Sequence, residues 1–215
     1  MYHHNVARKY RLKHRAERQD QTRRRIVEAA IELHETVGPA ATTVSEIAER
    51  AGVGRVTVYR HFPEELTLFQ ACSGLYLERH PLPDPARWSE IPDRFERFSV
   101  ALRDVYAYHR ANEAMFSHVL ADTRDHEVMA PYNDHWRRAT DVLLAPWRAR
   151  GGRHTLLRAG IGLALSFDTW RSLVREHGLT DDQAIDVALR LVHDTPAPRH
   201  DRSVAGSAQT RKVHA

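Results

Sequence analysis

The stretch from Thr43 to Phe62, TVSEIAERAGVGRVTVYRHF, decides the fold of this chain, because it predicts two short helices joined by a tight turn. Thr43 and Glu46 have the spacing of a capping box, in which the two side chains satisfy free N–H groups at a helix start. Ala48 is small, so the second helix can pack closely against it. Gly52, four residues later, supplies the positive φ that a sharp turn between the helices requires.

The second helix of the pair is expected over residues 55–61. Four apolar residues bury the angle between the two helices, namely Ile47, Val53, Val58 and Phe62. The remaining side chains project from the surface and can contact nucleic acid, namely Arg55, Val56, Thr57, Tyr59, Arg60 and His61. A helix presented in this way is typical of the recognition helix that enters the DNA major groove.

Longer helices are expected on both sides of this pair. An apolar stripe at helical spacing predicts a helix from about Asp20, which can cap it, to Val37, where Gly38 and Pro39 end it. Another helix is expected over 63–79, so the helix-turn-helix domain spans 20–80. Residues 1–19 are basic with few apolar positions, and we interpret them as a flexible arm or a frayed helical extension.

The segment His80-Pro81-Leu82-Pro83-Asp84-Pro85 cannot continue a helix and is interpreted as a link. The helical period returns over 91–110, 112–121, 131–149 with an interruption at Pro146, 153–177 and 181–193. Thr180 and Gln183 form a second capping box before the last of these. No segment alternates like a strand, so the fold is predicted to be all-α, with a second domain over 86–194. Residues 195–215 are expected to be a disordered tail.

The charge of the chain is distributed unevenly. Residues 1–62 carry a net charge of +5, whereas residues 63–194 carry −4. A basic end on an acidic body indicates that this end meets a polyanion, and the alternative is a solvated basic tail. The N-terminus lacks the apolar core of a signal peptide, and no apolar run reaches the roughly 20 residues of a membrane span, so we expect a cytoplasmic protein.

The usual signatures of catalysis and metal binding are missing from the sequence. It has no Gly-rich phosphate loop, no G-x-S-x-G and no H-E-x-x-H. The single cysteine, Cys72, excludes an intrachain disulfide and a cysteine metal cluster, and no two of the 15 histidines are spaced i, i+4. We therefore expect neither an enzyme nor a bound metal or cofactor.

Residues 43–62 resemble the TetR (tetracycline-repressor) family, whose pattern T-V-x-x-I-A-x-x-A-G-V-x-x-x-T-x-Y-x-H-F they match almost position by position. With the preceding long helix, the resemblance covers about residues 20–70. It implies that Arg55 and Val56 face the bases, where they can meet a guanine and a thymine methyl. It also implies that four further residues contact phosphate, namely Thr43, Thr57, Tyr59 and His61. The alternative for Tyr59 and His61 is that they only pack.

The sequence departs from the family at two points. Glu65 stands where the family usually has a lysine that contacts phosphate, and Glu64 precedes it. Two carboxylates would repel a phosphate, and the arginines of the N-terminal arm can compensate for that loss. The family also often has glycine at the position of Val56, so no operator sequence carries over.

The resemblance implies that the last two helices form a homodimer interface, which matches a palindromic operator. Residues 156–165, LLRAGIGLAL, mix large apolar residues with small ones, and 181–193 carry one apolar stripe. The alternative is that both helices pack inside one subunit.

Family members commonly bind a small hydrophobic effector between the helices of the second domain. Aromatic residues crowd this part of the chain, and six residues are the candidate effector pocket, namely Tyr106, His109, Phe116, Tyr132, Trp136 and Asp168. An ordinary core, with Asp168 paired or at the rim, is the alternative. The sequence thus predicts a DNA-binding regulator, by family default a repressor released by an effector. The alternative is a constitutive or architectural DNA-binding protein without effector control.

Overall fold

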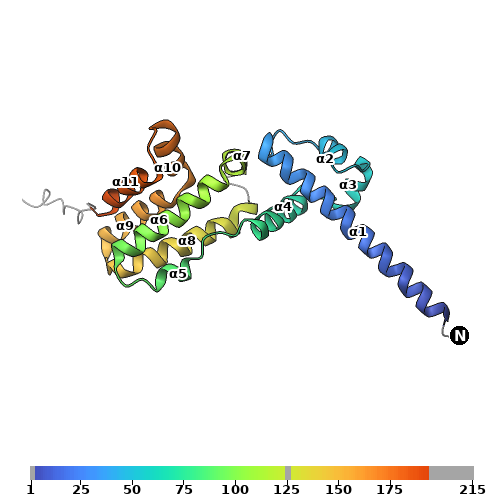
Figure 1. The fold of residues 1–215 in the computed structure, drawn as a ribbon, viewed down its shortest axis with the longest axis horizontal. Coiled ribbons are helices and arrows are strands. Elements are labelled where there is room, and N and C mark those ends of the chain that lie inside the picture. Colours follow the sequence, from blue (N-terminus) through green and yellow to red (C-terminus); the bar gives the residue numbers. More distant parts are fainter. Residues whose placement is uncertain (1–2, 124–126, 194–215) are drawn as a thin grey trace, which may run out of the picture.

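The computed structural model describes residues 3–123 and 127–193, and every regular element in these two ranges is a helix (Figure 1). The N-terminal unit contains α1 (His3–Thr36), α2 (Val44–Arg50), α3 (Arg55–His61) and α4 (Glu65–Arg79). The body contains α5 (Pro85–Ser89), α6 (Arg94–Ala111), α7 (Glu113–Thr123), α8 (Ala130–Leu144), α9 (Gly151–Leu165), α10 (Phe167–Arg171) and α11 (Asp181–His193). Short 3-10 turns lie at Glu127–Met129 and Ala145–Trp147, and a π turn at Ser172–Glu176. The all-α fold is confirmed, and the predicted tail over 195–215 lies outside the described residues.

The helix-turn-helix forms as its sequence predicts. The Glu46 N–H donates to Thr43 Oγ1 at 3.3 Å, and the Thr43 N–H donates to Glu46 Oε2 at 2.8 Å, which confirms the capping box. Gly52 has a φ of 64°, in the left-handed region that favours glycine. The buried side chains of Ile47 and Val58 close the angle between α2 and α3.

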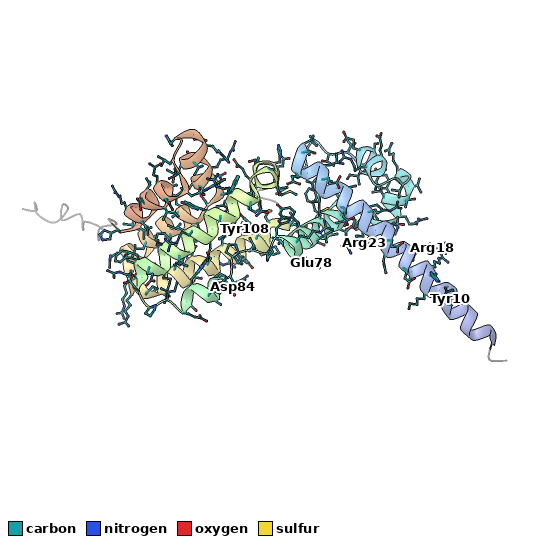
Figure 2. The ribbon with its side chains drawn as sticks, in the orientation of Figure 1. Tyr10, Arg18, Arg23, Glu78, Asp84 and Tyr108 are labelled. Atoms are coloured by element: carbon teal, nitrogen blue, oxygen red, sulfur yellow. The ribbon has the colours of Figure 1, made fainter. Side chains whose placement is uncertain are left out.

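The first helix begins much earlier than the apolar stripe predicts. It starts at His3 instead of near Asp20, so of the two interpretations of this segment, a flexible arm or a helical extension, the structure shows the helical one from that residue onward. Residues 1–19 contain neither glycine nor proline, and Lys13 pairs with Glu17 at 3.9 Å, an i, i+4 contact that supports a helix. The extension projects beyond the rest of the N-terminal unit, where Tyr10 and Arg18 are labelled in Figure 2.

The long helix expected over 153–177 is broken at Ser166. Its backbone is extended, with φ −74° and ψ 144°, and its hydroxyl accepts the Thr169 N–H at 3.2 Å to cap α10. A serine side chain that bonds to nearby backbone competes with the helix in this way. A further short helix, α5, was not expected, although Asp84 caps it and Pro85 occupies its first turn.

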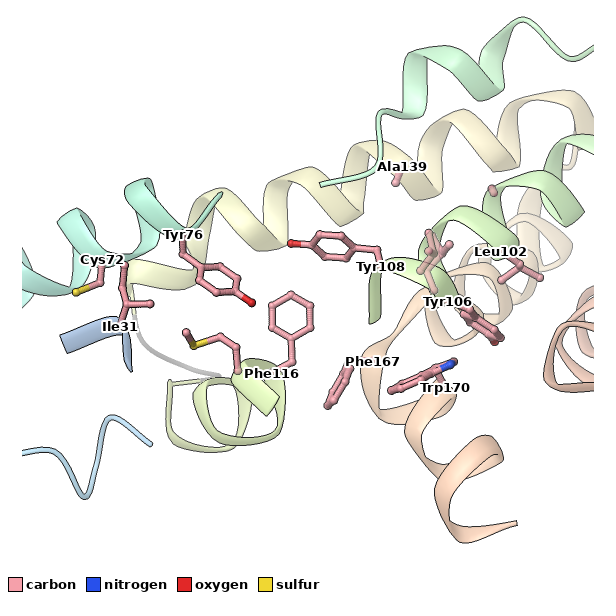
Figure 3. Packing of buried hydrophobic residues seen from close by; sticks show 14 of the residues in the cluster. Ile31, Cys72, Tyr76, Leu102, Tyr106, Tyr108, Phe116, Ala139, Phe167 and Trp170 are labelled. Atoms are coloured by element: carbon pink, nitrogen blue, oxygen red, sulfur yellow. The ribbon is translucent and has the colours of Figure 1, made fainter. Parts of the chain in front are cut away.

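One continuous cluster of buried residues runs through both parts of the molecule. Figure 3 follows it from Ile31 and Cys72, through Tyr76 and Phe116, to Trp170 in the body. The core is therefore shared between the N-terminal unit and the body.

Polar contacts also join the N-terminal unit to the body. The Tyr76 hydroxyl donates to Asn112 Oδ1 at 2.7 Å, which joins α4 to the end of α6. His118 Nδ1 of α7 donates to the Glu35 carbonyl at 3.1 Å. Gly38, with a φ of 87°, lies so close to α7 that a Cβ atom would stand 2.9 Å from Asp122 Oδ2. We call this contact between α1 and α4 on one side and α6 and α7 on the other the interdomain seam.

None of the helices that the structure describes combines the length and the apolar character needed to cross a membrane.

Candidate DNA interface and effector cavities

Helix α3 presents its predicted DNA-contacting side chains to solvent. Val56 is 80% exposed and Tyr59 is 48% exposed, and Arg55 and Arg60 are exposed beside them. These residues recur at i, i+1, i+4 and i+5, so they share one side of the helix. Two further predicted contacts, Thr57 and His61, are half-buried. An exposed valine beside an arginine at the start of a helix is suited to contact with base edges.

Thr43 stands at the start of α2 with its hydroxyl already in use. Its Oγ1 donates to Glu46 Oε2 at 2.7 Å while it accepts the Glu46 N–H. A phosphate at this helix start would have to share the hydroxyl with a carboxylate. The structure therefore gives Thr43 a helix-capping role, and its phosphate contact stays a prediction.

Arg23 fixes the C-terminal end of α3, a role that the sequence did not reveal. Its Nη1 donates to the His61 carbonyl at 3.1 Å, and its guanidinium lies 4.1 Å from the centroid of the Phe62 ring. The two contacts hold the recognition helix against α1. Burial, followed by the charges of Arg60 and Arg23, lowers the pKa of His61, so its ring is neutral at pH 7 and can donate a hydrogen bond without adding charge.

A basic groove lies where the extension of α1 passes the end of α3. Its lining residues share a capacity to donate hydrogen bonds, and they are Arg15, Arg18, Gln19, Thr22, Arg60 and His61. The groove therefore suits an anion such as a DNA phosphate. By contrast, Glu65 lies in the first turn of α4, where its carboxylate complements the helix dipole, which gives this departure from the family a structural role.

Three of the six predicted effector-pocket residues meet at one cavity. This cavity, of about 480 Å³, lies among α7, α8, α9 and α10, and we call it the body cavity. Tyr132, Trp136 and Asp168 line it together with Phe167. Asp168 is an exposed residue of the first turn of α10, so it stands at the rim and not within an apolar helix.

Tyr106 and His109 differ from that prediction, because both are fully buried and line neither cavity that we describe. The Tyr106 hydroxyl donates to the Ala164 carbonyl at 3.1 Å, and His109 Nε2 donates to the Leu165 carbonyl at 3.0 Å. They brace the end of α9 before the Ser166 break. Burial lowers the pKa of His109 to about 4, which keeps its ring neutral among the surrounding aromatic rings.

A second cavity, of about 410 Å³, lies at the interdomain seam, and we call it the seam cavity. Phe116 and Tyr132, both predicted pocket residues, line its body side. Its other side comes from α1 and α4, and includes Ile31, His34, Phe69, Cys72 and Tyr76. No pattern in the sequence indicates this half, because only tertiary packing brings α1 and α4 against α7.

An apolar surface on α9 and α11 is open to solvent in the single chain. Four large apolar residues there are close to half exposed, namely Leu156, Leu163, Val187 and Leu191. Ala164, one of the small residues of 156–165, is fully buried within the single chain. We call the four exposed residues the apolar face, and its position agrees with the predicted interface over 153–193.

These features define a class of protein. A capped helix, a glycine turn and an exposed basic helix, carried on a helical body with cavities, make a helix-turn-helix DNA-binding protein.

Comparison with known proteins shows the family. Residues 26–72 match the family of bacterial regulatory proteins described as the tetR family. The chain is 36% identical over 105 residues to the uncharacterised HTH-type transcriptional regulator TtgW of Pseudomonas putida, a match that covers 46% of this chain and 72% of that protein. It is also 36% identical over 106 residues to the HTH-type transcriptional regulator SrpR of Pseudomonas putida, which covers 47% of this chain and 46% of that protein, so the match spans about half the length of SrpR. The chain belongs to the TetR family of helix-turn-helix transcriptional regulators, which are not enzymes.

A solved structure agrees on the fold. It is a regulator of Clostridium perfringens provisionally assigned to fatty acid metabolism, and it superposes with a TM-score of 0.56 at 21% identity. The match covers 81% of this chain and all of that one, so the helical body follows the arrangement of a solved relative as well.

Proposed function

We propose that this protein is a cytoplasmic repressor that binds a palindromic operator as a homodimer and is released by a small hydrophobic effector. The observation that carries the proposal is the seam cavity, because its walls come from both the DNA-binding unit and the body. An occupant of this cavity touches both parts at once.

A ligand changes DNA affinity only if it binds the two arrangements of the protein unequally. The helices α1 and α4 line the seam cavity, and α1 packs against both α4 and α2 and bonds to the end of α3 through Arg23. A ligand that prefers a different spacing of α4 and α7 therefore shifts the two recognition helices of a dimer away from their half-sites. Coupling of this kind is typically worth about 1–3 kcal/mol for a single effector site.

Arg55→Ala tests whether α3 recognises the DNA sequence. Losing a base contact costs about 1–3 kcal/mol and relaxes the preference at one base pair of each half-site. We therefore expect weaker binding to the operator and nearly unchanged binding to scrambled DNA, measured by fluorescence anisotropy. The matched control is Arg60→Ala, which removes a basic-groove residue and should weaken binding to both DNAs alike. An Arg55→Ala protein that loses equal affinity for operator and scrambled DNA would show that Arg55 contacts phosphate instead.

A further inference from the structure

The body cavity and the seam cavity adjoin each other. Leu120, Met129 and Tyr132 line both of them. Leucine and methionine side chains change rotamer readily, and methionine in particular adapts to irregular spaces. The shared wall can therefore open, and the two cavities can hold one elongated molecule.

The body cavity is the polar end of this space. Trp136 lines this cavity, and its buried Nε1 has no hydrogen-bond partner among the described residues. A buried N–H without a partner is costly, so the site favours a ligand atom that accepts a hydrogen bond. The carboxylate of Asp168 lines the same cavity and can accept a hydrogen bond from the ligand.

The arginines of the body cavity do not make it a site for an anion. Arg137 pairs with Asp134 at 2.6 Å, and Arg158 pairs with Asp141. Both guanidinium groups therefore already have carboxylate partners. A neutral hydroxyl suits this lining, because it can accept a hydrogen bond from Trp136 and donate one to Asp168.

Aromatic side chains surround the same end. The rings of Tyr132 and Trp136 meet edge to face, with centroids 5.9 Å apart, and Phe167 lines the cavity beside them. Such walls suit an aromatic ring, so the hydroxyl that fits this end is a phenol.

The seam cavity is the apolar end. It is lined by Ile31, Phe69, Met115 and Val119, and by His34, whose ring stacks on Phe69 at a centroid distance of 5.2 Å. Burial lowers the pKa of His34 to about 4, so no charge stands in this wall at pH 7. A space of this composition takes an alkyl chain.

We propose that a single neutral amphiphile of the alkylphenol type occupies both cavities. Its phenol lies against Trp136 and Asp168, and its alkyl tail passes Tyr132 into the interdomain seam. The tail is the part that contacts α1 and α4, so its length controls DNA release. The effector role of this ligand rests on the proposed function, whereas its binding does not.

The test uses 4-alkylphenols from methyl to hexyl, titrated into the full-length protein by isothermal titration calorimetry. Each methylene that enters an apolar cavity should strengthen binding about three- to fourfold. We expect this rise along the series, and the same tail dependence in release of a labelled operator. An affinity that does not depend on tail length would overturn the proposal.

Two kinds of variant separate the ends of the site. Trp136→Phe keeps a ring but removes the N–H, and should weaken every member of the series by a similar factor, roughly five- to tenfold. Val119→Phe on α7 and Ser73→Leu on α4 fill the seam cavity from opposite sides. Both should leave 4-methylphenol binding unchanged and abolish the gain from longer tails. Circular dichroism and a cooperative thermal transition show that each variant folds, and a tail dependence that survives both seam variants contradicts the proposed path.

The remaining arms separate this inference from the proposed function. 4-Alkylbenzoates should bind more weakly than the phenols. Tighter binding of the benzoates would contradict the proposal that the polar end of the ligand is neutral. If the phenols bind with the expected tail dependence but leave operator affinity unchanged, the alkylphenol site is supported and the proposed release of DNA by an effector is contradicted. If the protein binds its operator specifically and no alkylphenol binds, the ligand inference is wrong, whereas the assignment as a sequence-specific regulator is unaffected.

Discussion

Leu163→Glu should convert the proposed homodimer into monomers and lower operator affinity by at least about a hundredfold. Leu163 is 53% exposed on α9, within the apolar face that continues onto α11. In a two-fold interface the same patch occurs twice, so each substitution places two carboxylates in an apolar contact. Burying an unpaired charge costs several kcal/mol, which is enough to dissociate a dimer at micromolar concentration. A monomer then holds a single half-site.

The measurement is light scattering coupled to size-exclusion chromatography at micromolar protein, followed by operator titration. The matched control is Val37→Glu, because Val37 is 48% exposed at the end of α1 and away from the apolar face. That variant should stay dimeric. A Leu163→Glu protein that stays dimeric would place the interface elsewhere.

Deleting residues 1–18 should have the second large effect, which is a loss of affinity without a change in the sequence selected. This segment contains six basic residues from Arg8 to Arg18, of which Arg15 and Arg18 line the basic groove beside α3. If each arm of a dimer contacts two phosphates, the log–log dependence of affinity on salt should flatten by about 3.6. Each such contact contributes roughly fivefold at 0.15 M salt, so affinity should fall on the order of several hundredfold.

The deletion is tested by titrating operator and scrambled DNA across a salt series. The apolar stripe of α1 that begins at Ile26 stays intact, so the truncated protein keeps its core. A truncated protein that selects a different sequence, for example one without an A·T preference at the flanks, would show that the arm reads the minor groove.

The parts of the fold that the sequence predicted are those that local interactions decide. The capping box at Thr43, the turn at Gly52 and the exposed face of α3 each depend on residues no more than five positions apart. The second capping box, in which Thr180 and Gln183 exchange hydrogen bonds at 3.0 and 3.3 Å, is predictable for the same reason.

The parts that it did not predict depend on competition or on distant contacts. The break at Ser166 occurs in a run that is helical by periodicity, and a single serine hydroxyl decides it. Tyr106 and His109 look like pocket residues by composition, yet both are buried, and the Tyr106 hydroxyl and His109 Nε2 bond to carbonyls at the end of α9. The seam cavity joins Ile31 to Phe116, and no local pattern links two positions so far apart.

The measurement that tests the central claim most directly is selection of bound sequences from a random DNA library by the full-length protein. A dimer with one recognition helix per subunit predicts an inverted repeat, whose half-site centres lie about one helical turn, or a multiple of it, apart. The positions read by Arg55 and Val56 should recur symmetrically in both half-sites. Enrichment of no sequence, or of a motif without two-fold symmetry, would contradict the account of this protein as a dimeric, sequence-reading regulator.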